Sequence, residues 1–247
     1  MTKTAIFVEG QTELIFVREM LLKLFEWQNI SIECYTLFVD HQHHPTEYAF
    51  LSTEAAWYFQ INNVGNDKGL VTRIKNREKY LWNSGFTRII GLRDMYSKEY
   101  KEIKKQNVID QAVNLKFING YQEQIRNFSE RPQDIYFHFA IMETEAWILG
   151  FNDIFQKINP DLTNEKIAQE LGFNLNEIDP ELYFFHPATN LQAIFQLSND
   201  SYDKSKGDVN KLMSYIEKED FDYLATSDKC ESFRTFFRSV DYRSEAE

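Results

Sequence analysis

The chain has 247 residues, 43% of them apolar, which is enough to bury a substantial core. The 21 Phe, 13 Tyr and 4 Trp, against 9 Gly and 5 Pro, exclude a disordered or repetitive chain. No apolar stretch approaches the roughly 20 residues of a membrane span, so we expect a cytoplasmic protein with no membrane contact. A net charge of -11 opposes free binding to nucleic acid, which would need metal ions, a basic patch or a partner protein.

The first third of the chain is typical of an α/β protein. A short apolar strand over 5–8 is followed by an amphipathic helix over 12–26 and a second strand over 32–39. A third strand is expected over 55–64. The switch from strand to helix at Glu9 places a carboxylate at the carboxyl end of a strand, where open α/β sheets bind their ligands.

The same alternation of helix and strand continues to about residue 150. The pattern predicts a basic helix over 70–82, a strand over 86–92, a solvated loop or short helix over 96–106, a helix over 108–128 and a strand over 135–141. Beyond that, helical segments are broken at Pro160 and Gly172. We therefore expect an α/β catalytic domain over 1–150 and a helical extension over 151–247 that packs on it.

Two groups of potential metal ligands do not form a familiar site. His41, His43 and His44 lie in a polar segment closed by Pro45, but their spacing fits no common zinc pattern, and a solvated loop explains them as well. Cys34 and Cys230 lie far apart without a CxxC pairing, as in a protein of a reducing compartment. We expect both cysteines to be ordinary buried or half-buried residues.

Acidic residues follow three of the predicted strands. Glu9, Asp94 and the pair Glu143 and Glu145 each stand at a strand end. Because neighbouring parallel strands end at the same edge of a sheet, we expect these carboxylates to form one cluster. Clustered carboxylates favour a divalent cation, and oxygen ligands without nearby cysteine favour Mg²⁺ or Mn²⁺. Such a site can orient a phosphodiester and activate water.

The segment 7–13, Phe-Val-Glu-Gly-Gln-Thr-Glu, resembles the opening VEGxTE motif of TOPRIM domains, the Mg²⁺-binding α/β modules of topoisomerases, primases and OLD-type nucleases. It is most similar to the TOPRIM-like nucleases encoded beside ABC-type ATPases in bacterial anti-phage defence. The resemblance implies that Glu9 is the catalytic glutamate, that Asp94 opens the DxD metal motif, and that Glu145, preceded by Glu143, is a later metal ligand.

The resemblance also extends weakly to the tail and departs from the family at one position. Tyr202-Asp203-Lys204 is similar to a lysine-containing motif near the family's C-terminus, which implies that Lys204 stabilises charge on the phosphate. The second acid of the DxD motif is replaced by Tyr96. Glu13, Glu143 or Glu145 could supply the missing oxygen, the site could hold a single ion, or the protein could be an inactive descendant.

The sequence thus predicts a Mg²⁺-dependent endonuclease that cleaves DNA or RNA, working with an ABC-type ATPase partner in antiviral defence. Its catalytic residues would be Glu9, Asp94, Glu145 and Lys204, with Glu13 and Glu143 as further metal ligands. A catalytically inactive, metal- or partner-binding subunit is the alternative, and primase-type nucleotidyl transfer ranks below both. Homo-oligomer formation is left open.

Overall fold

The computed structural model describes residues 1–37, 42–65, 69–151, 153–203 and 207–241. The chain forms two compact units, each made from separate stretches of the sequence. The first contains Met1–Arg93, Ala112–Phe139 and Ser239–Glu247, and the second contains Asp94–Gln111 and Ala140–Arg238. The domain boundary predicted near residue 150 lies inside the second of these units.

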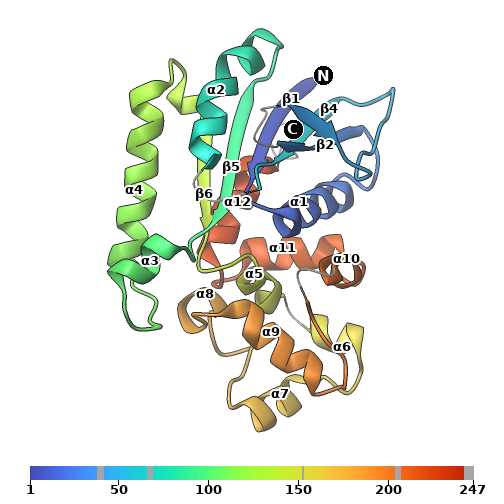
Figure 1. The fold of residues 1–247 in the computed structure, drawn as a ribbon. Coiled ribbons are helices and arrows are strands. Elements are labelled where there is room, and N and C mark those ends of the chain that lie inside the picture. Colours follow the sequence, from blue (N-terminus) through green and yellow to red (C-terminus); the bar gives the residue numbers. More distant parts are fainter. Residues whose placement is uncertain (38–41, 66–68, 152, 204–206, 242–247) are drawn as a thin grey trace. The chain divides into compact units, whose positions relative to one another are not determined.

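A six-stranded sheet has the strand order β3-β2-β4-β1-β5-β6 (Figure 1). β1 pairs in parallel with β4 and β5, β2 pairs in parallel with β4, and the short edge strand β3 is antiparallel to β2. The sheet confirms the predicted α/β class with a mostly parallel, Rossmann-like arrangement. The strands are β1 (Thr2–Val8), β2 (Ile30–Leu37), β3 (His43–Pro45), β4 (Trp57–Asn63), β5 (Arg88–Asp94) and β6 (Ile135–Ala140).

The central strand β1 is a continuous apolar run because it is covered on both faces. Ala5, Ile6, Phe7 and Val8 are fully buried, as expected for a strand in the middle of a parallel sheet. Helix α1 (Gln11–Leu24) packs against β1, β2 and β4, and helix α2 (Leu70–Asn83) packs against β1. The carboxyl end of β1 is therefore held firmly by its neighbours.

The strand β5 contains a glycine that packing requires. A methyl group at Gly91 would lie 2.6 Å from the ring of Phe137 on β6 and 3.1 Å from the side chain of Leu70, the first residue of α2.

The third large helix of the first unit is α4 (Gln111–Phe128), which precedes β6 in the chain.

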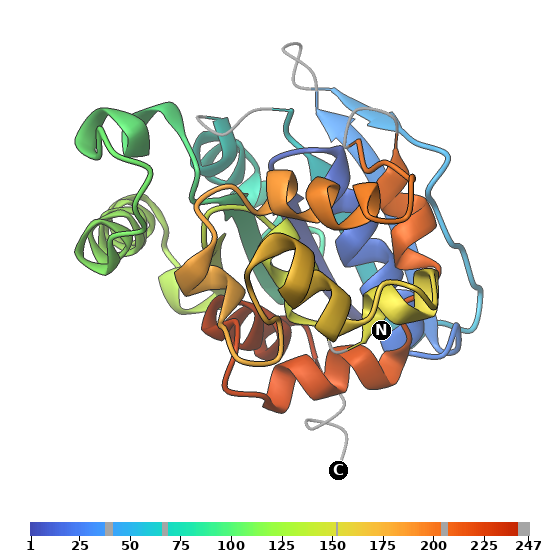
Figure 2. The ribbon, with the colours of Figure 1, turned by 90° about the horizontal axis from the view of Figure 1, so that it is seen from below.

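The second unit is helical, and it includes most of the predicted C-terminal extension. Its centre is Trp147, whose ring is fully buried, stacks on Phe236 at 5.5 Å and meets the edge of Phe233 at 5.4 Å. Figure 2 shows this unit from below, with α7 and α9 next to each other. The helices are α3 (Lys98–Ile103), α5 (Glu145–Gly150), α6 (Ile154–Ile158), α7 (Asn164–Leu171), α8 (Pro180–Tyr183), α9 (Pro187–Gln196), α10 (Asp208–Met213), α11 (Lys218–Thr226) and α12 (Glu231–Val240), whose last residues belong to the first unit.

The segment around the histidines differs from the loop considered above. His43, His44 and Pro45 form β3, with His44 opposite Thr36 of β2. Proline is tolerated here because an edge strand needs no donor on its outer side. Across the described residues, no helix is both long enough and apolar enough to cross a membrane.

Candidate functional site

Glu9 follows the last residue of β1 and stands directly before helix α1. Its side chain is 25% exposed. The next residue, Gly10, is the extended N-cap of α1, and its carbonyl accepts the first helical hydrogen bond from Leu14 at 3.2 Å. A methyl group at Gly10 would lie 2.9 Å from Oε2 of the buried Glu13, so the glycine makes room for that carboxylate at the start of the helix. A carboxylate in the first helical turn is favoured by the exposed backbone N–H groups.

A buried arginine accompanies Glu9. Nε of Arg93, near the end of β5, lies 3.9 Å from Oε2 of Glu9, and the Arg93 side chain is only 1% exposed. Its guanidinium donates a hydrogen bond to the hydroxyl of Tyr121 and lies over the rings of Tyr121 and Phe139, at 5.2 and 5.6 Å. A buried cation needs such compensation, so the position of Arg93 is fixed and it holds a positive charge beside Glu9.

Polar amides extend this edge of the sheet. Asn63 ends β4 opposite Val8 of β1, and its amide donates a 3.4 Å hydrogen bond to Gln11 at the start of α1. The Asn63 side-chain oxygen also accepts the backbone N–H of Gly65 at 2.9 Å. Within the first unit, the carboxyl ends of β1 and β4 therefore present Glu9, Gln11 and Asn63 together.

This edge lies where the strand order reverses. After β1 the chain passes through α1 to β2 on one side of the sheet, and after β5 it passes through α3 and α4 to β6 on the other side. β1 and β5 are parallel neighbours, with Val8 opposite Leu92. In open α/β sheets the crevice at such a reversal is the usual ligand site. Glu9 and Arg93 stand at that position.

The remaining predicted acids belong to the second unit, where Asp94 binds the turn after β6. Oδ1 of Asp94 accepts the backbone N–H of Thr144 at 3.0 Å. Two backbone bonds support this turn, from Met95 N–H to the Ala140 carbonyl and from Tyr96 N–H to the Met142 carbonyl, both at 2.8 Å. Asp94 thus has a defined structural partner.

Glu143 and Glu145 bind different elements, as their spacing allows. Oε2 of Glu143 accepts the backbone N–H of Ala188 at 3.0 Å, in the first turn of α9. Glu145 is fully buried, and its Oε1 accepts a 3.0 Å hydrogen bond from the hydroxyl of Tyr202. The Thr144 hydroxyl lies 3.5 Å from the other Glu145 oxygen. Both carboxylates are thus hydrogen-bonded within the second unit.

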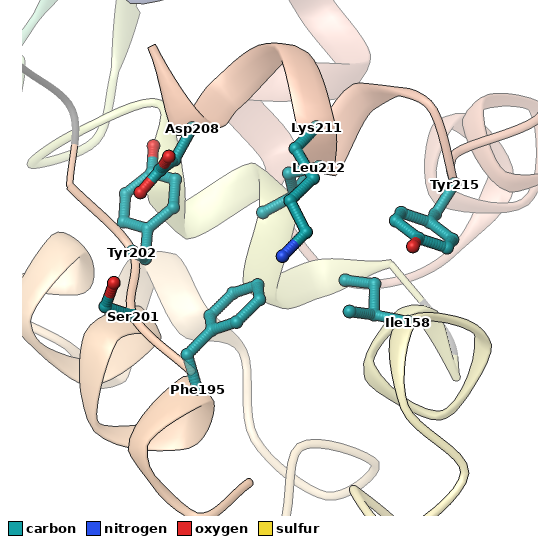
Figure 3. Close-up of a pocket in the computed structure, with 8 residues that line it drawn as sticks. All are labelled: Ile158, Phe195, Ser201, Tyr202, Asp208, Lys211, Leu212 and Tyr215. Carbon is teal, nitrogen blue, oxygen red and sulfur yellow. The ribbon is translucent and has the colours of Figure 1, made fainter. Parts of the chain in front are cut away.

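Tyr202 belongs to the predicted lysine motif, of which Lys204 lies outside the described residues. Next to Tyr202 is a small hollow of the second unit that also contacts α10 (Figure 3). Its interior volume of about 10 Å³ is what one water molecule requires. The hollow therefore has no room for a nucleotide.

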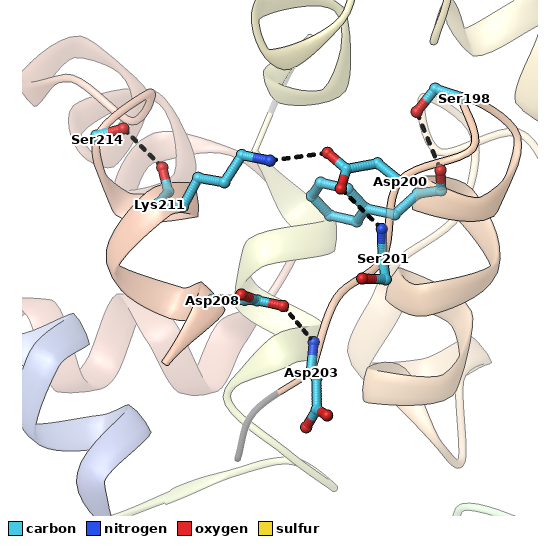
Figure 4. Close-up of polar contacts among 8 residues, drawn as sticks. Ser198, Asp200, Ser201, Asp203, Asp208, Lys211 and Ser214 are labelled. Atoms are coloured by element: carbon cyan, nitrogen blue, oxygen red, sulfur yellow. Dashed lines mark hydrogen bonds and ion pairs between the residues drawn. The ribbon is translucent and has the colours of Figure 1, made fainter. Parts of the chain in front are cut away.

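A network of polar contacts surrounds the segment next to this hollow (Figure 4). Asp200 forms an ion pair with Lys211 at 2.8 Å. It also accepts a 2.9 Å hydrogen bond from the backbone N–H of Ser201. Asp208 accepts the backbone N–H of Asp203 at 2.8 Å. These bonds fix the segment that carries Tyr202.

Tyr96, at the position of the missing acid, is a packed aromatic residue. Its ring meets Phe185 and His186 edge-on at 5.7 and 5.1 Å, and the Lys101 ammonium lies 4.3 Å above it. Among the described residues, no three His, Cys, Asp or Glu side chains are grouped to hold a metal ion. The sharing of one Mg²⁺ by Glu9, Asp94 and Glu145 stays a prediction.

His43 and the two cysteines are packed against neighbouring groups, and His41 lies outside the described residues. His43 stacks on Tyr35 at 4.7 Å, and burial together with the nearby Arg77 charge lowers its pKa to about 4. Cys34 and Cys230 are buried and free, as expected, and burial raises the pKa of both thiols.

Sequence reasoning missed Arg93 and the pairing of Tyr202 with Glu145. A charged residue inside an apolar run that ends at a strand tip was the one available signal for Arg93. The Tyr202 contact joins residues 57 positions apart and had no local signal.

The sheet and its helices define a Rossmann-like α/β protein in which Glu9 stands at the strand reversal. The chain belongs to the family described as a domain of unknown function, DUF4276, whose model matches residues 8–241. No curated protein and no solved structure matches the chain significantly.

Proposed function

We propose that the chain is a metal-dependent phosphodiesterase of nucleic acids, similar to TOPRIM nucleases, and that Glu9 is its central catalytic residue. The single observation that carries this proposal is the position of Glu9. It is a partly exposed carboxylate at the carboxyl end of the central strand, where the strand order reverses, and it lies beside a buried guanidinium. Its surrounding segment is the one that resembles the TOPRIM motif.

The residues at this edge are compatible with Mg²⁺ or Mn²⁺. Magnesium sites in phosphate-processing proteins use one or two carboxylates and complete the shell with water and substrate phosphate oxygens. Glu9 would be a hard oxygen ligand, and the Glu13 carboxylate and the Asn63 side-chain oxygen would offer further oxygens near the start of α1. A bound ion would supply Lewis acidity and an activated water at neutral pH.

Arg93 has a positioning role in this proposal. Because it is buried under Tyr121 and Phe139, it acts on Glu9 and not directly on a substrate. Its charge favours the ionised carboxylate, which is the form that binds metal. It also fixes the direction of the Glu9 side chain, and ligands fixed in this way bind metal more tightly.

The biological setting is proposed from the resemblance alone. A nuclease of this type would act with an ABC-type ATPase in antiviral defence in the cytoplasm. The partner would also supply positive charge, which a chain of net charge -11 needs near a polyanion.

The test is a cleavage assay on single- and double-stranded DNA and RNA with Mg²⁺ or Mn²⁺. We expect Glu9→Gln to lower the cleavage rate about 100-fold or more, the effect of losing one acid–base or charge-stabilising group. The matched control is Glu54→Gln, which removes one exposed carboxylate before β4 and should leave the rate unchanged. Equal rates for wild type and Glu9→Gln would refute the assignment.

A second candidate is a non-catalytic subunit that uses the same edge to bind a metal ion or a partner. The observation that favours it is the internal bonding of Asp94, Glu143 and Glu145, each of which accepts a hydrogen bond within the second unit. Mn²⁺ titration followed by electron paramagnetic resonance separates the two. Binding that depends on Glu9 without any cleavage supports this candidate, and cleavage excludes it.

A further inference from the structure

One face of the sheet over β2 and β4 is polar, although the other face is apolar. In the parallel register Ser31, Glu33 and Tyr35 lie opposite Tyr58, Gln60 and Asn62. The intervening residues Ile32, Cys34, Phe59 and Ile61 are buried on the side where α1 packs. Successive residues of a strand point to opposite faces, so these six polar and aromatic side chains share the face away from α1.

Hydrogen bonds and stacking order this polar face. Glu33 accepts hydrogen bonds from the hydroxyls of Tyr35, at 2.8 Å, and Tyr58. The Tyr35 ring stacks on His43 of β3, and the Gln60 amide lies 3.5 Å from the His43 ring. The carboxylate of Glu33 is therefore directed to two tyrosines within the sheet face.

Helix α2 carries a basic face beside this surface. Arg73, Asn76, Arg77 and Tyr80 follow the spacing i, i+3, i+4 and i+7, which places them on one side of the helix. They line an open hollow of about 440 Å³, within the roughly 300–1,000 Å³ of small-ligand sites. None of the described residues that line it is acidic.

Electrostatic effects show that the basic face of α2 and the polar sheet face are close. The charge of Arg77 contributes to the lowered pKa of His43, and Tyr80 contributes to the raised pKa values of Tyr35 and Tyr58. Burial, followed by the neighbouring Arg73 charge, lowers the pKa of Arg77 itself. Arg73 and Arg77 carry like charges in one half-buried hollow, and an anion bound between two such charges would lower their mutual repulsion.

Three side chains of the hollow, Arg73, Arg77 and Tyr80, suit parts of a nucleotide. Guanidinium groups match phosphate oxygens with two parallel hydrogen bonds. Tyr80 is 66% exposed, so its ring is accessible for stacking on a base. Lys75 and Lys79 are also exposed, but they lie on other sides of α2, and Lys75 is directed to the ring of Phe128 at 6.0 Å.

We propose that this hollow binds a single-stranded nucleic acid, with Arg73 and Arg77 on its phosphates and Tyr80 stacked on a base. The choice of nucleic acid as the ligand rests on the proposed function, whereas the anion site itself rests on the geometry of α2. The hollow would give an acidic chain a local basic surface for its substrate.

The test is fluorescence anisotropy of a short labelled oligothymidylate at low salt, with a chelator present so that no cleavage occurs. We expect Arg73→Gln/Arg77→Gln to weaken binding about 10-fold or more. The slope of log affinity against log salt should fall by about 1.4, because each phosphate contact to a single strand contributes about 0.7. Tyr80→Leu should weaken binding at least about 5-fold through lost stacking.

The matched control is Lys75→Gln/Lys79→Gln, which removes two charges from the same helix on other sides. If this control keeps the wild-type affinity for the oligonucleotide and the wild-type salt slope, the arginine face of α2 is supported as the binding site. If the lysine pair and the arginine pair lose equal affinity, the proposal is overturned. Absence of oligonucleotide binding by the wild type overturns it as well. Arg73→Lys/Arg77→Lys keeps the two positive charges but removes the bidentate contacts of the guanidinium groups, so we expect an affinity between those of the wild type and the glutamine pair. Circular dichroism checks that every variant is folded.

The two proposals fail in different ways. Binding that depends on the arginines without cleavage under any condition would remove the nuclease assignment and leave this site intact. Cleavage that requires Glu9 but is unchanged in Arg73→Gln/Arg77→Gln would support the nuclease assignment and remove the proposed binding site.

Discussion

The hydroxyl of Tyr202 donates a 3.0 Å hydrogen bond to the carboxylate of Glu145, across 57 positions of sequence. Glu145 is fully buried at the start of α5, and Tyr202 is nearly so. A carboxylate removed from water is costly unless hydrogen bonds replace its solvation. This bond therefore ties the segment after α9 to the start of α5 within the second unit.

Tyr202→Phe should destabilise the protein, because it removes one of the donors to a buried carboxylate. We expect a loss of about 1–3 kcal/mol in the free energy of unfolding, the cost of leaving a buried acceptor unsatisfied. Urea unfolding followed by circular dichroism measures it. Tyr223→Phe alters a tyrosine that is 44% exposed and should change stability by less than about 0.5 kcal/mol.

Glu181 makes stability depend on pH. Its carboxylate accepts hydrogen bonds from Trp147 Nε1 at 2.7 Å, from the backbone of Ser232 at 3.1 Å and from the Ser232 hydroxyl. Burial nevertheless raises the pKa of Glu181 from 4.5 to about 7. A raised pKa means that the folded state prefers the protonated acid.

The Glu181 contribution to stability is therefore fully present below about pH 4.5 and is lost as the pH rises to about 7. The loss is on the order of 3 kcal/mol, since each pKa unit corresponds to about 1.4 kcal/mol. Glu181→Gln should remove this slope from the unfolding free energy measured between these pH values. Glu170→Gln, at an exposed helical position, should retain it. An unchanged slope in Glu181→Gln would contradict the assignment.

Two glycines should respond to alanine in opposite directions. Gly91→Ala places a methyl group 2.6 Å from Phe137 and should cost about 1–3 kcal/mol through overpacking. Gly120→Ala, in the interior of α4, meets no atom within 4 Å and should stabilise by about 0.5–1 kcal/mol. Thermal unfolding of both variants compares them, and a stable Gly91→Ala protein would show that β5, β6 and α2 are less tightly packed.

Asp220, the third residue of helix α11, completes a capping box with the N-cap Glu217 and pairs with Lys157. Its carboxylate accepts the Glu217 backbone N–H at 2.7 Å and lies 2.5 and 2.6 Å from the Lys157 ammonium. Asp220→Ala should cost about 1–2 kcal/mol in chemical unfolding, because it removes both a capping-box hydrogen bond and a partly buried ion pair. Asp222→Ala, which removes a more exposed pair with Lys218, should cost less than about 0.5 kcal/mol. Similar losses in both would mean that the cap contributes little.

Local pattern was sufficient for most elements of this fold. The apolar run before Glu9 and the helical spacing after it predicted β1 and α1 to within a few residues, because both lie in the core and their periodicity reflects burial. The three-residue strand β3 was not predicted. It is too short for a periodic signal, and it pairs with β2 through backbone groups that carry no side-chain pattern.

The candidate site was predictable only in part. The placement of Glu9 at a strand end followed from the pattern, but its pairing with Arg93 depends on β1 and β5 being neighbours, which the order of strands along the chain does not reveal. The internal partners of Glu143 and Glu145 were equally hidden. Ala188 and Tyr202 come from segments 45 and 57 residues away.

The position of β1 between β4 and β5 has a consequence for synthesis of the chain. Thr2–Val8 leaves the ribosome before either of its partners, Trp57–Asn63 and Arg88–Asp94, has been translated. Pairing between segments so distant is slow, and until then an apolar strand remains exposed to aggregation. Nascent chains that stop before residue 88 should therefore depend on chaperones, and Glu9 reaches its place beside Arg93 only after β5 has been made.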